Sequence, residues 1–172
     1  MKLSKQDFYF GALLSLLVKT GFVPAIIEEG ESNQIYKITT NYDYVFYSKY
    51  LSKTSSESKK DSTWQFQFSE LELKRIRDLS PNEKFIFAFV CGRLGLRESE
   101  IAFLSIKELQ ECLGIDYQTP NRTVAMRTTN GSPYIKAYGT GRDRYDQSLQ
   151  ITRNPKTRLD QFKETIQPNY VS

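Results

Sequence analysis

The chain has 172 residues, a net charge of +4 and no histidine. At this length one domain can bury its own core without disulfides or a structural metal. The lack of histidine removes the commonest general base, the commonest metal ligand and every nucleophile activated by a histidine. The two cysteines support neither a disulfide framework nor a four-ligand zinc site. We therefore expect reduced, buried thiols in a cytoplasmic protein.

A helix is predicted from Lys5 to Thr20. Ser4 is a good N-cap, with Asp7 three residues later, and apolar residues follow at helical spacing. Gly21 stands where such a helix would end. The apolar run over residues 8–18 is too short to span a bilayer and has amphipathic spacing, so it predicts a core helix and no membrane association.

Three stretches rich in β-branched or aromatic residues predict strands: 34–40, 44–50 and 64–68. Asn41, Tyr42 and Asp43 can form a tight turn, so the first two strands should make a hairpin. The third alternates aromatic residues with glutamine, which indicates one wet face. The intervening segment, 51–62, is polar and is expected to be a loop.

The middle of the chain alternates between capping boxes and apolar runs. Each box has a serine followed three residues later by a glutamate, and each predicts a helix start. The pairs are Ser69 with Glu72 and Ser105 with Glu108. The run Phe85–Cys91 is apolar on both faces, as in a central strand covered on both sides, and Ile101–Leu104 is its shorter neighbour.

The last third has strand patterns with polar faces. Thr123–Thr128 and Tyr134–Tyr138 flank Asn130-Gly131, a strong hairpin signal. A further strand is expected at Leu149–Thr152, followed by a short closing helix. Gly139-Thr-Gly141 lacks the following helix that a phosphate-binding loop needs.

These patterns predict a single domain over residues 1–172 of the α/β (α+β) class. We expect a mixed β-sheet with helices on its faces over residues 1–118. Residues 119–172 form a basic, β-rich extension with a C-terminal hairpin.

Positive charge is concentrated after Thr119, where the sequence has nine Lys and Arg residues but four Asp and Glu residues. Such a basic segment is typical of a surface that contacts phosphates, and DNA is the expected partner. The candidate contacts are Lys49, Lys53, Arg127, Lys136, Arg142 and Arg144. A solvated surface explains the same charges equally well.

Carboxylates flank the predicted hairpin and could hold a hard divalent cation such as Mg²⁺. The candidate ligands are Glu31, Asp43 and Asp61. Surface solubility accounts for these residues as well. Lys49, near the end of a largely apolar strand, could polarise a phosphate or could be an edge lysine that discourages strand pairing.

The order helix, hairpin, third strand, helix, central strand, further strand and helix resembles the core of the restriction-endonuclease-like, PD-(D/E)XK, nuclease superfamily over residues 4–114. Lys49 stands where the motif lysine of that family would fall. The resemblance implies magnesium-dependent DNA cleavage, with Asp43 and Lys49 as catalytic residues. Tyr47 occupies the position of an expected acid, and the nearby Glu72-Leu-Lys74 belongs to a helix start.

Two hypotheses follow. The first is a nucleic-acid-binding protein that, in its enzymatic form, is a DNA endonuclease. The second is a non-enzymatic protein-interaction module or inhibitor, which docks through an aromatic sheet edge and the Asn130-Gly131 hairpin. Clustering of the basic residues with Lys49 favours the first, and scatter favours the second. A tyrosine-rich sheet edge could equally pair with a second copy of the chain.

Overall fold

The computed structural model describes residues 1–29, 36–41, 43–81, 84–114, 122–143 and 147–164. The helices are α1 (Lys5–Lys19), α2 (Glu70–Asp78), α3 (Ile106–Leu113) and α4 (Pro155–Glu164). The first strands are β1 (Pro24–Glu29), β2 (Tyr36–Thr40), β3 (Val45–Leu51), β4 (Ser56–Glu57) and β5 (Asp61–Phe68). They are followed by β6 (Phe85–Cys91), β7 (Glu100–Ser105), β8 (Arg122–Thr129), β9 (Tyr134–Gly139) and β10 (Leu149–Thr152).

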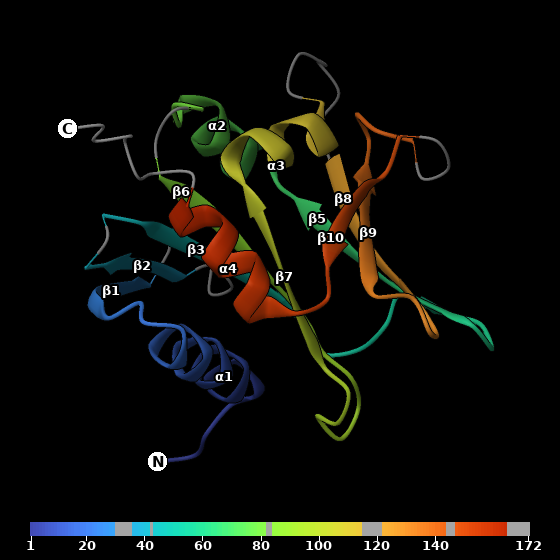
Figure 1. Cartoon of the computed structure of the whole chain (residues 1–172), viewed down its shortest axis with the longest axis horizontal. Helices are drawn as coiled ribbons and strands as arrows, with labels where there is room; N and C mark the ends of the chain where they lie inside the picture. The colour runs from blue at the N-terminus through green and yellow to red at the C-terminus, as the bar shows by residue number, and fades with distance from the viewer. Residues whose placement is uncertain (30–35, 42, 82–83, 115–121, 144–146, 165–172) are drawn as a thin grey trace.

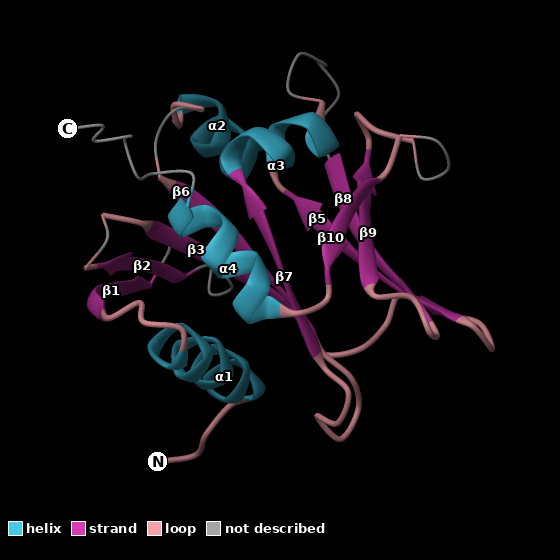
Figure 2. Cartoon of the chain, in the orientation of Figure 1, coloured by secondary structure: helices cyan, strands magenta, loops and turns pink. Residues whose placement is uncertain are grey.

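The strands form two five-stranded sheets (Figures 1 and 2). Sheet A has the order β1-β2-β3-β6-β7, and sheet B has the order β10-β9-β8-β5-β4. Only β3 and β6 pair in parallel among the described strands, because the chain crosses from one to the other through β4, β5 and α2. The predicted single α+β domain with a mixed sheet is confirmed.

Strand β6 is the apolar centre of the molecule. Phe87 and Phe89 point toward sheet B, α2 and α3, whereas Ile86 and Ala88 point toward α1 and α4. Each of these side chains is at most 7% exposed. The prediction of a central strand covered on both faces is confirmed: sheet B with α2 and α3 covers one face, and α1 with α4 covers the other.

The predicted helix starts are also confirmed. Capping boxes open α1 at Ser4, α2 at Ser69 and α3 at Ser105, and in each the serine side chain accepts from the backbone of the third helical residue. Helix α3 ends at Gly114, whose φ of 63° is the left-handed conformation that glycine adopts without a Cβ clash.

Strand β5 lies in sheet B rather than beside the β2–β3 hairpin. It pairs with β8 along its whole length, from Asp61 with Thr129 to Phe68 with Arg122. Residues 122–152 therefore contribute three strands to a sheet that β5 shares, and their inward side chains join the same core as Trp64. The sequence carried no local signal of this pairing, because the partners are more than 50 residues apart.

The segment 51–62 contains a small hairpin where the sequence predicts a loop. Strand β4 pairs with β5 through Ser56 with Thr63 and Glu57 with Ser62. The Oγ of Ser58 accepts from the backbone N–H of Asp61, which stabilises the turn. Serine does not favour strands, so the sequence pattern gives no sign of this hairpin, which the hydrogen bonds of its serines stabilise.

The outer face of sheet B is polar and open. Gln65 and Gln67 are exposed, as the alternation predicts. The register places Arg127 beside Thr63 on one side and Lys136 on the other. In the described part of the chain no helix packs on this face, since the helices join cores on the other side of the sheet.

Candidate functional site

Lys49 lies in the interior between the two sheets. Its Nζ is 2.9 Å from Oε1 of Glu72, and the two side chains are 12% and 11% exposed. It also donates to the backbone oxygen of Gln67 and lies 4.5 Å from the ring centroid of Phe68. Strand β3 runs between β2 and β6, so Lys49 is not an edge lysine. Its contacts tie α2 and the end of β5 to sheet A.

The structure does not bring Lys49 to the predicted acids. Asp61 opens β5, six residues before Gln67, and six residues of strand span about 20 Å. Asp43 lies six residues before Lys49, exposed in the β2–β3 turn with φ of 59°. Glu31 lies outside the described residues. Among the residues that are described, no group of three Cys, Asp or Glu side chains is placed to hold a metal ion.

Asp61 belongs to an ion pair on sheet B. Its carboxylate accepts from Arg127 and from the Thr129 hydroxyl. These two hydrogen bonds lower the pKa of Asp61, and the positive charges of Arg127 and Lys136 lower it further. The carboxylate is thus a partner for the basic residues of its own sheet.

The predicted nucleic-acid contacts separate into different environments. Arg127 and Lys136 are cross-strand neighbours on the outer face of sheet B. Arg142 pairs with Glu111 of α3 at 2.9 Å, and Lys53 is exposed before β4. Arg144 lies outside the described residues. Two of the six are therefore adjacent, and neither lies with Lys49.

Acidic partners neutralise most other described basic residues after Thr119. Arg153 pairs with Glu100, Arg158 with Glu108, and Lys156 with Asp160. Arg122 is fully buried and donates to the backbone oxygen of Leu113. The sequence therefore overstated how basic the surface of this segment is.

Gly139 and Gly141 have a packing role. A Cβ on Gly139 would lie 2.4 Å from the backbone oxygen of Thr123, and one on Gly141 would lie 2.4 Å from Cα of Gly114. The N–H of Gly141 donates to the backbone oxygen of Cys112 at 2.9 Å. These glycines let the loop after β9 approach the end of α3, which agrees with the argument against a phosphate-binding loop.

Three hairpins gather at one end of the two sheets, and we call them the hairpin platform. Counted with the adjoining strand ends, they are residues 57–61 of the β4–β5 hairpin, residues 92–100 of the β6–β7 hairpin and residues 129–133 of the β8–β9 hairpin. In Figure 1 they lie on the lower right side of the molecule, where the β6–β7 hairpin extends downward and the other two extend to the right. Binding surfaces are often built from loops that a rigid scaffold brings together in this way.

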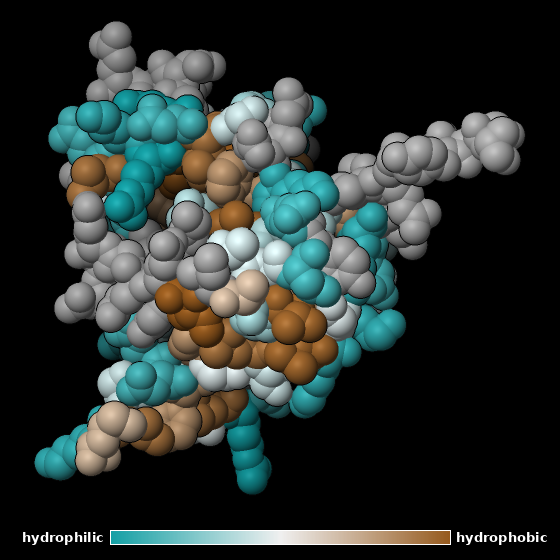
Figure 3. Space-filling model, turned by 90° about the vertical axis from the view of Figure 1, so that its left-hand side faces the viewer, coloured by the Kyte–Doolittle hydropathy of each residue, from teal (hydrophilic) through white to brown (hydrophobic). Residues whose placement is uncertain are grey.

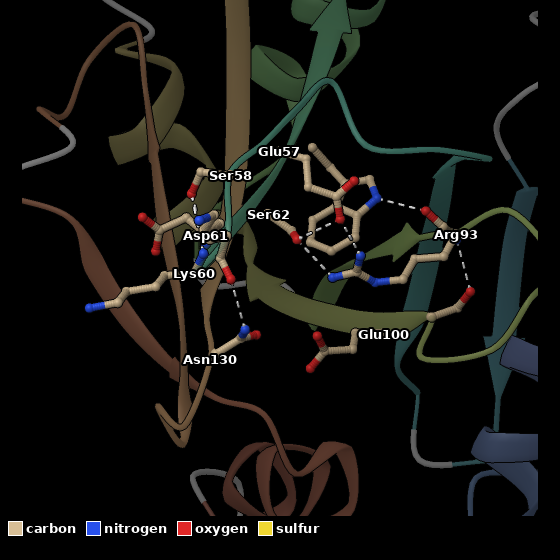
Figure 4. Close-up of polar contacts among 12 residues, drawn as sticks. Glu57, Ser58, Lys60, Asp61, Ser62, Arg93, Glu100 and Asn130 are labelled. Carbon is tan, nitrogen blue, oxygen red and sulfur yellow. Dashed lines mark hydrogen bonds and ion pairs between the residues drawn. The ribbon is translucent and has the colours of Figure 1, made fainter.

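Arg93 joins the first two hairpins (Figure 4). Its guanidinium donates to Glu57 at 2.9 Å and to the Ser62 hydroxyl at 2.8 Å. It also lies 5.0 Å from the ring centroid of Trp64, whose indole N–H donates to the Gly92 oxygen at 2.7 Å. The planar guanidinium suits this combination of stacking and paired hydrogen bonds.

Arg153 joins the second and third hairpins. It binds both carboxylate oxygens of Glu100, at 2.7 and 2.9 Å, and donates to the backbone oxygen of Ser132 at 3.0 Å. Asn130 in turn donates from its backbone N–H to the backbone oxygen of Lys60 and from its side-chain amide to the backbone oxygen of Lys59. The three hairpins are thus bound to one another.

The β6–β7 hairpin carries the exposed apolar part of the platform. Leu94 and Leu96 are 78% and 50% exposed. Leu96 and Glu98 have φ of 66° and 60°, which is costly for residues with a Cβ. The β6–β7 hairpin thus combines two exposed leucines with a strained tip and a base that Arg93 fixes.

The sequence reasoning missed Arg93, Arg153 and the two leucines. The available signal was the pair of leucines on either side of Gly95, since apolar residues at a hairpin tip have no strand face to bury. The ion pairs themselves join residues distant in sequence and leave no spacing to detect.

Comparisons with protein-family models, curated proteins and solved structures found no significant match to this chain. Within the described residues, every helix is too short or too polar to traverse a bilayer.

Proposed function

We propose that the protein is a non-enzymatic protein-interaction module that docks on a protein partner through the hairpin platform. The observation that carries this proposal is the exposure of Leu94 and Leu96 on a hairpin held at its base by Arg93. A preorganised tip with apolar anchors lowers the entropy cost of binding. The scatter of the basic residues, and their use in ion pairs, supports the same proposal.

A cytoplasmic location fits this module. Cys91 and Cys112 are free and buried. Burial raises the pKa of the Cys91 thiol well above its usual value and that of Cys112 to about 12. Thiols protected in this way are compatible with a reducing compartment.

We expect the double variant Leu94→Asp/Leu96→Asp to lose the partner. Two carboxylates at the tip would have to be desolvated in the interface, and binding should weaken by at least about tenfold. The fold should survive, because aspartate adopts the left-handed conformation at position 96 more readily than leucine. The measurement is affinity capture with quantitative mass spectrometry, followed by titration of the captured protein in purified form.

Leu71→Asp is the matched control. Leu71 is 57% exposed in the first turn of α2, where a carboxylate is favourable. It should retain every protein that the wild type captures. Equal capture by all three proteins would refute docking through the platform.

A second candidate function is nucleic-acid binding by the outer face of sheet B. Arg127 and Lys136 lie directly opposite each other in the β8–β9 ladder, and Asp61, which pairs with Arg127, offsets part of their repulsion. Exposed Gln65 and Gln67 lie on the same open sheet, and polar side chains of this kind contact phosphates and bases. Duplex or single-stranded DNA is the ligand we would test first.

We expect Lys136→Glu to weaken DNA binding across all sequences and to reduce its salt dependence by about one phosphate contact. The substitution removes a like-charge neighbour of Arg127, so it should not unfold the sheet. Lys156→Glu on α4, with a side chain 70% exposed, is the control for net charge. Binding should be measured by fluorescence anisotropy at several salt concentrations. Equal losses of DNA affinity in both variants would argue against DNA binding by this face.

The magnesium-dependent endonuclease stays a prediction. Its support is the resemblance in element order. Its catalytic residues would be Asp43 and Lys49, and its candidate metal ligands are Glu31, Asp43 and Asp61. A denaturing gel of labelled DNA, run with and without magnesium, tests it in the same samples. Shortened product that requires magnesium and disappears in Asp43→Ala would support the nuclease, and intact DNA would argue for binding alone.

A further inference from the structure

Exposed apolar side chains concentrate at the start of the described chain. Of the ten large apolar side chains that are exposed among the described residues, six lie before residue 28. They are Met1, Leu3, Phe8, Val18, Val23 and Ile27. Figure 3 shows a broad hydrophobic area on the side of the molecule that carries β1 and α1. This area does not include the hairpin platform.

Helix α1 presents an uncharged outer face. Tyr9, Leu13 and Leu17 are buried against sheet A, while Phe8 and Val18 on the opposite side are 52% and 58% exposed. Residues 8–18 contain no charged side chain. A surface helix normally has charged residues on its solvent side, so this face is unusual for a helix that contacts only water.

Small residues lie at the centre of that face. Asp7, Gly11, Ser15 and Lys19 follow one another at intervals of four and so form one row along the helix. A Cβ at Gly11 would meet nothing within 4 Å. Glycine inside a helix costs about 1 kcal/mol relative to alanine, and no contact in the described chain requires it here. Close approach of another helix would require a residue without a side chain at this position.

The ends of the row carry opposite charges. Asp7 is exposed near the start of α1 and accepts hydrogen bonds from Ser4, which lower its pKa and keep it ionised. Lys19 is exposed in the last turn. If two such rows are laid antiparallel, each acid faces the lysine of the other, and each Gly11 faces the other Ser15. The row is therefore complementary to itself.

We infer that the outer face of α1 binds a second copy of this chain in an antiparallel helix pair centred between Gly11 and Ser15. Packing of the two four-residue rows gives a crossing angle of about −50°, and small residues at the crossing allow the shorter helix separations. Phe8 and Val18 flank the crossing and bury their exposed surface in the pair. The interface forms a closed twofold dimer and leaves the hairpin platform free.

The test compares the oligomeric state of the full chain with that of Gly11→Arg. Arginine is a good helix former in an open position, so this monomer should be as stable as the wild type or more stable. It cannot fit at the crossing, and the dimer dissociation constant should rise by at least about tenfold. Thr157→Arg, at an exposed position of α4, adds the same charge and should leave the dimer unchanged.

Sedimentation equilibrium over a concentration series measures these constants. A dimer that dissociates in Gly11→Arg and persists in Thr157→Arg supports the proposal. A wild type that stays monomeric throughout the series overturns it and leaves a foreign protein as the occupant of this face. A dimer that Gly11→Arg does not weaken also overturns it.

Cysteine cross-linking tests the antiparallel orientation. Both native thiols are buried, so an introduced cysteine on α1 is the accessible one among the described residues. Mixing Gly11→Cys protein with Ser15→Cys protein should give a covalent dimer under mild oxidation, faster than either variant gives alone. Faster coupling of Gly11→Cys with itself would contradict the antiparallel pair.

Discussion

Glu72→Ala should lower the free energy of unfolding by about 3–5 kcal/mol, because it leaves the Lys49 ammonium buried without its partner. It also removes the carboxylate that accepts from the backbone N–H of Ser69 at 2.7 Å. Urea denaturation followed by circular dichroism measures the loss, which should appear as a lower midpoint with an unchanged slope.

Two further variants separate the cap from the ion pair. Glu72→Gln keeps a capping residue but removes the charge, so its free energy of unfolding should lie between those of the wild type and Glu72→Ala. The double variant Lys49→Met/Glu72→Gln removes both charges and should recover part of the loss. Asp7→Ala is the control, measured at a protein concentration too low for the proposed α1 pair to form, because Asp7 has the same capping position in α1 but is exposed. A loss in Glu72→Ala no larger than in Asp7→Ala would contradict a structural ion pair.

The result also bears on the nuclease prediction. Catalytic residues often lower the stability of a protein, and replacing them then raises it. A large loss on breaking the Lys49–Glu72 pair would mean that Lys49 holds α2 to sheet A. A gain would favour a catalytic lysine and would make the magnesium-dependent assay the more informative experiment.

Local patterns in the sequence predicted the elements well. The alternation of aromatic residues with Gln65 and Gln67 indicated one wet face, and the two glutamines are exposed. The two-sided apolar run of β6 indicated a central strand, and β6 lies between β3 and β7. Both signals depend on hydrophobic periodicity, which is a property of a few neighbouring residues.

The sheet membership of β5 and the partners of the charged residues could not be predicted in this way. Strand β5 pairs with β8, which follows it by more than 50 residues, and a strand pattern does not specify its partner. Likewise Arg153 and Arg158 meet Glu100 and Glu108 only in the folded chain. Net charge counted along the sequence therefore suggested a basic surface where the fold makes ion pairs.

Trp64→Ala should cost about 3–5 kcal/mol, because Trp64 is fully buried and fills the space between sheet B and sheet A. It should also release the hairpin platform locally. The indole donates to the Gly92 oxygen and supports the Arg93 guanidinium, so its loss removes two contacts that fix the base of the β6–β7 hairpin.

Phe66→Ala distinguishes the local effect from general destabilisation. Phe66 is fully buried two residues along the same strand and packs on Phe89, so its global cost should be similar. Hydrogen exchange of the backbone amides of Arg93 and Leu96 is the measurement. Their exchange should accelerate beyond the global unfolding rate only in Trp64→Ala. Equal acceleration in both variants would mean that the hairpin depends on the core as a whole.

The milder Trp64→Phe connects this rigidity to binding. It keeps an aromatic ring under Arg93 but lacks the N–H that Gly92 accepts, so the fold should persist while the hairpin loosens. If Leu94 and Leu96 bind a partner as a preorganised tip, Trp64→Phe should lower the affinity for that partner, although it changes no exposed residue. Full retention of affinity with faster exchange of the Leu96 amide would show that the tip adapts to its partner instead.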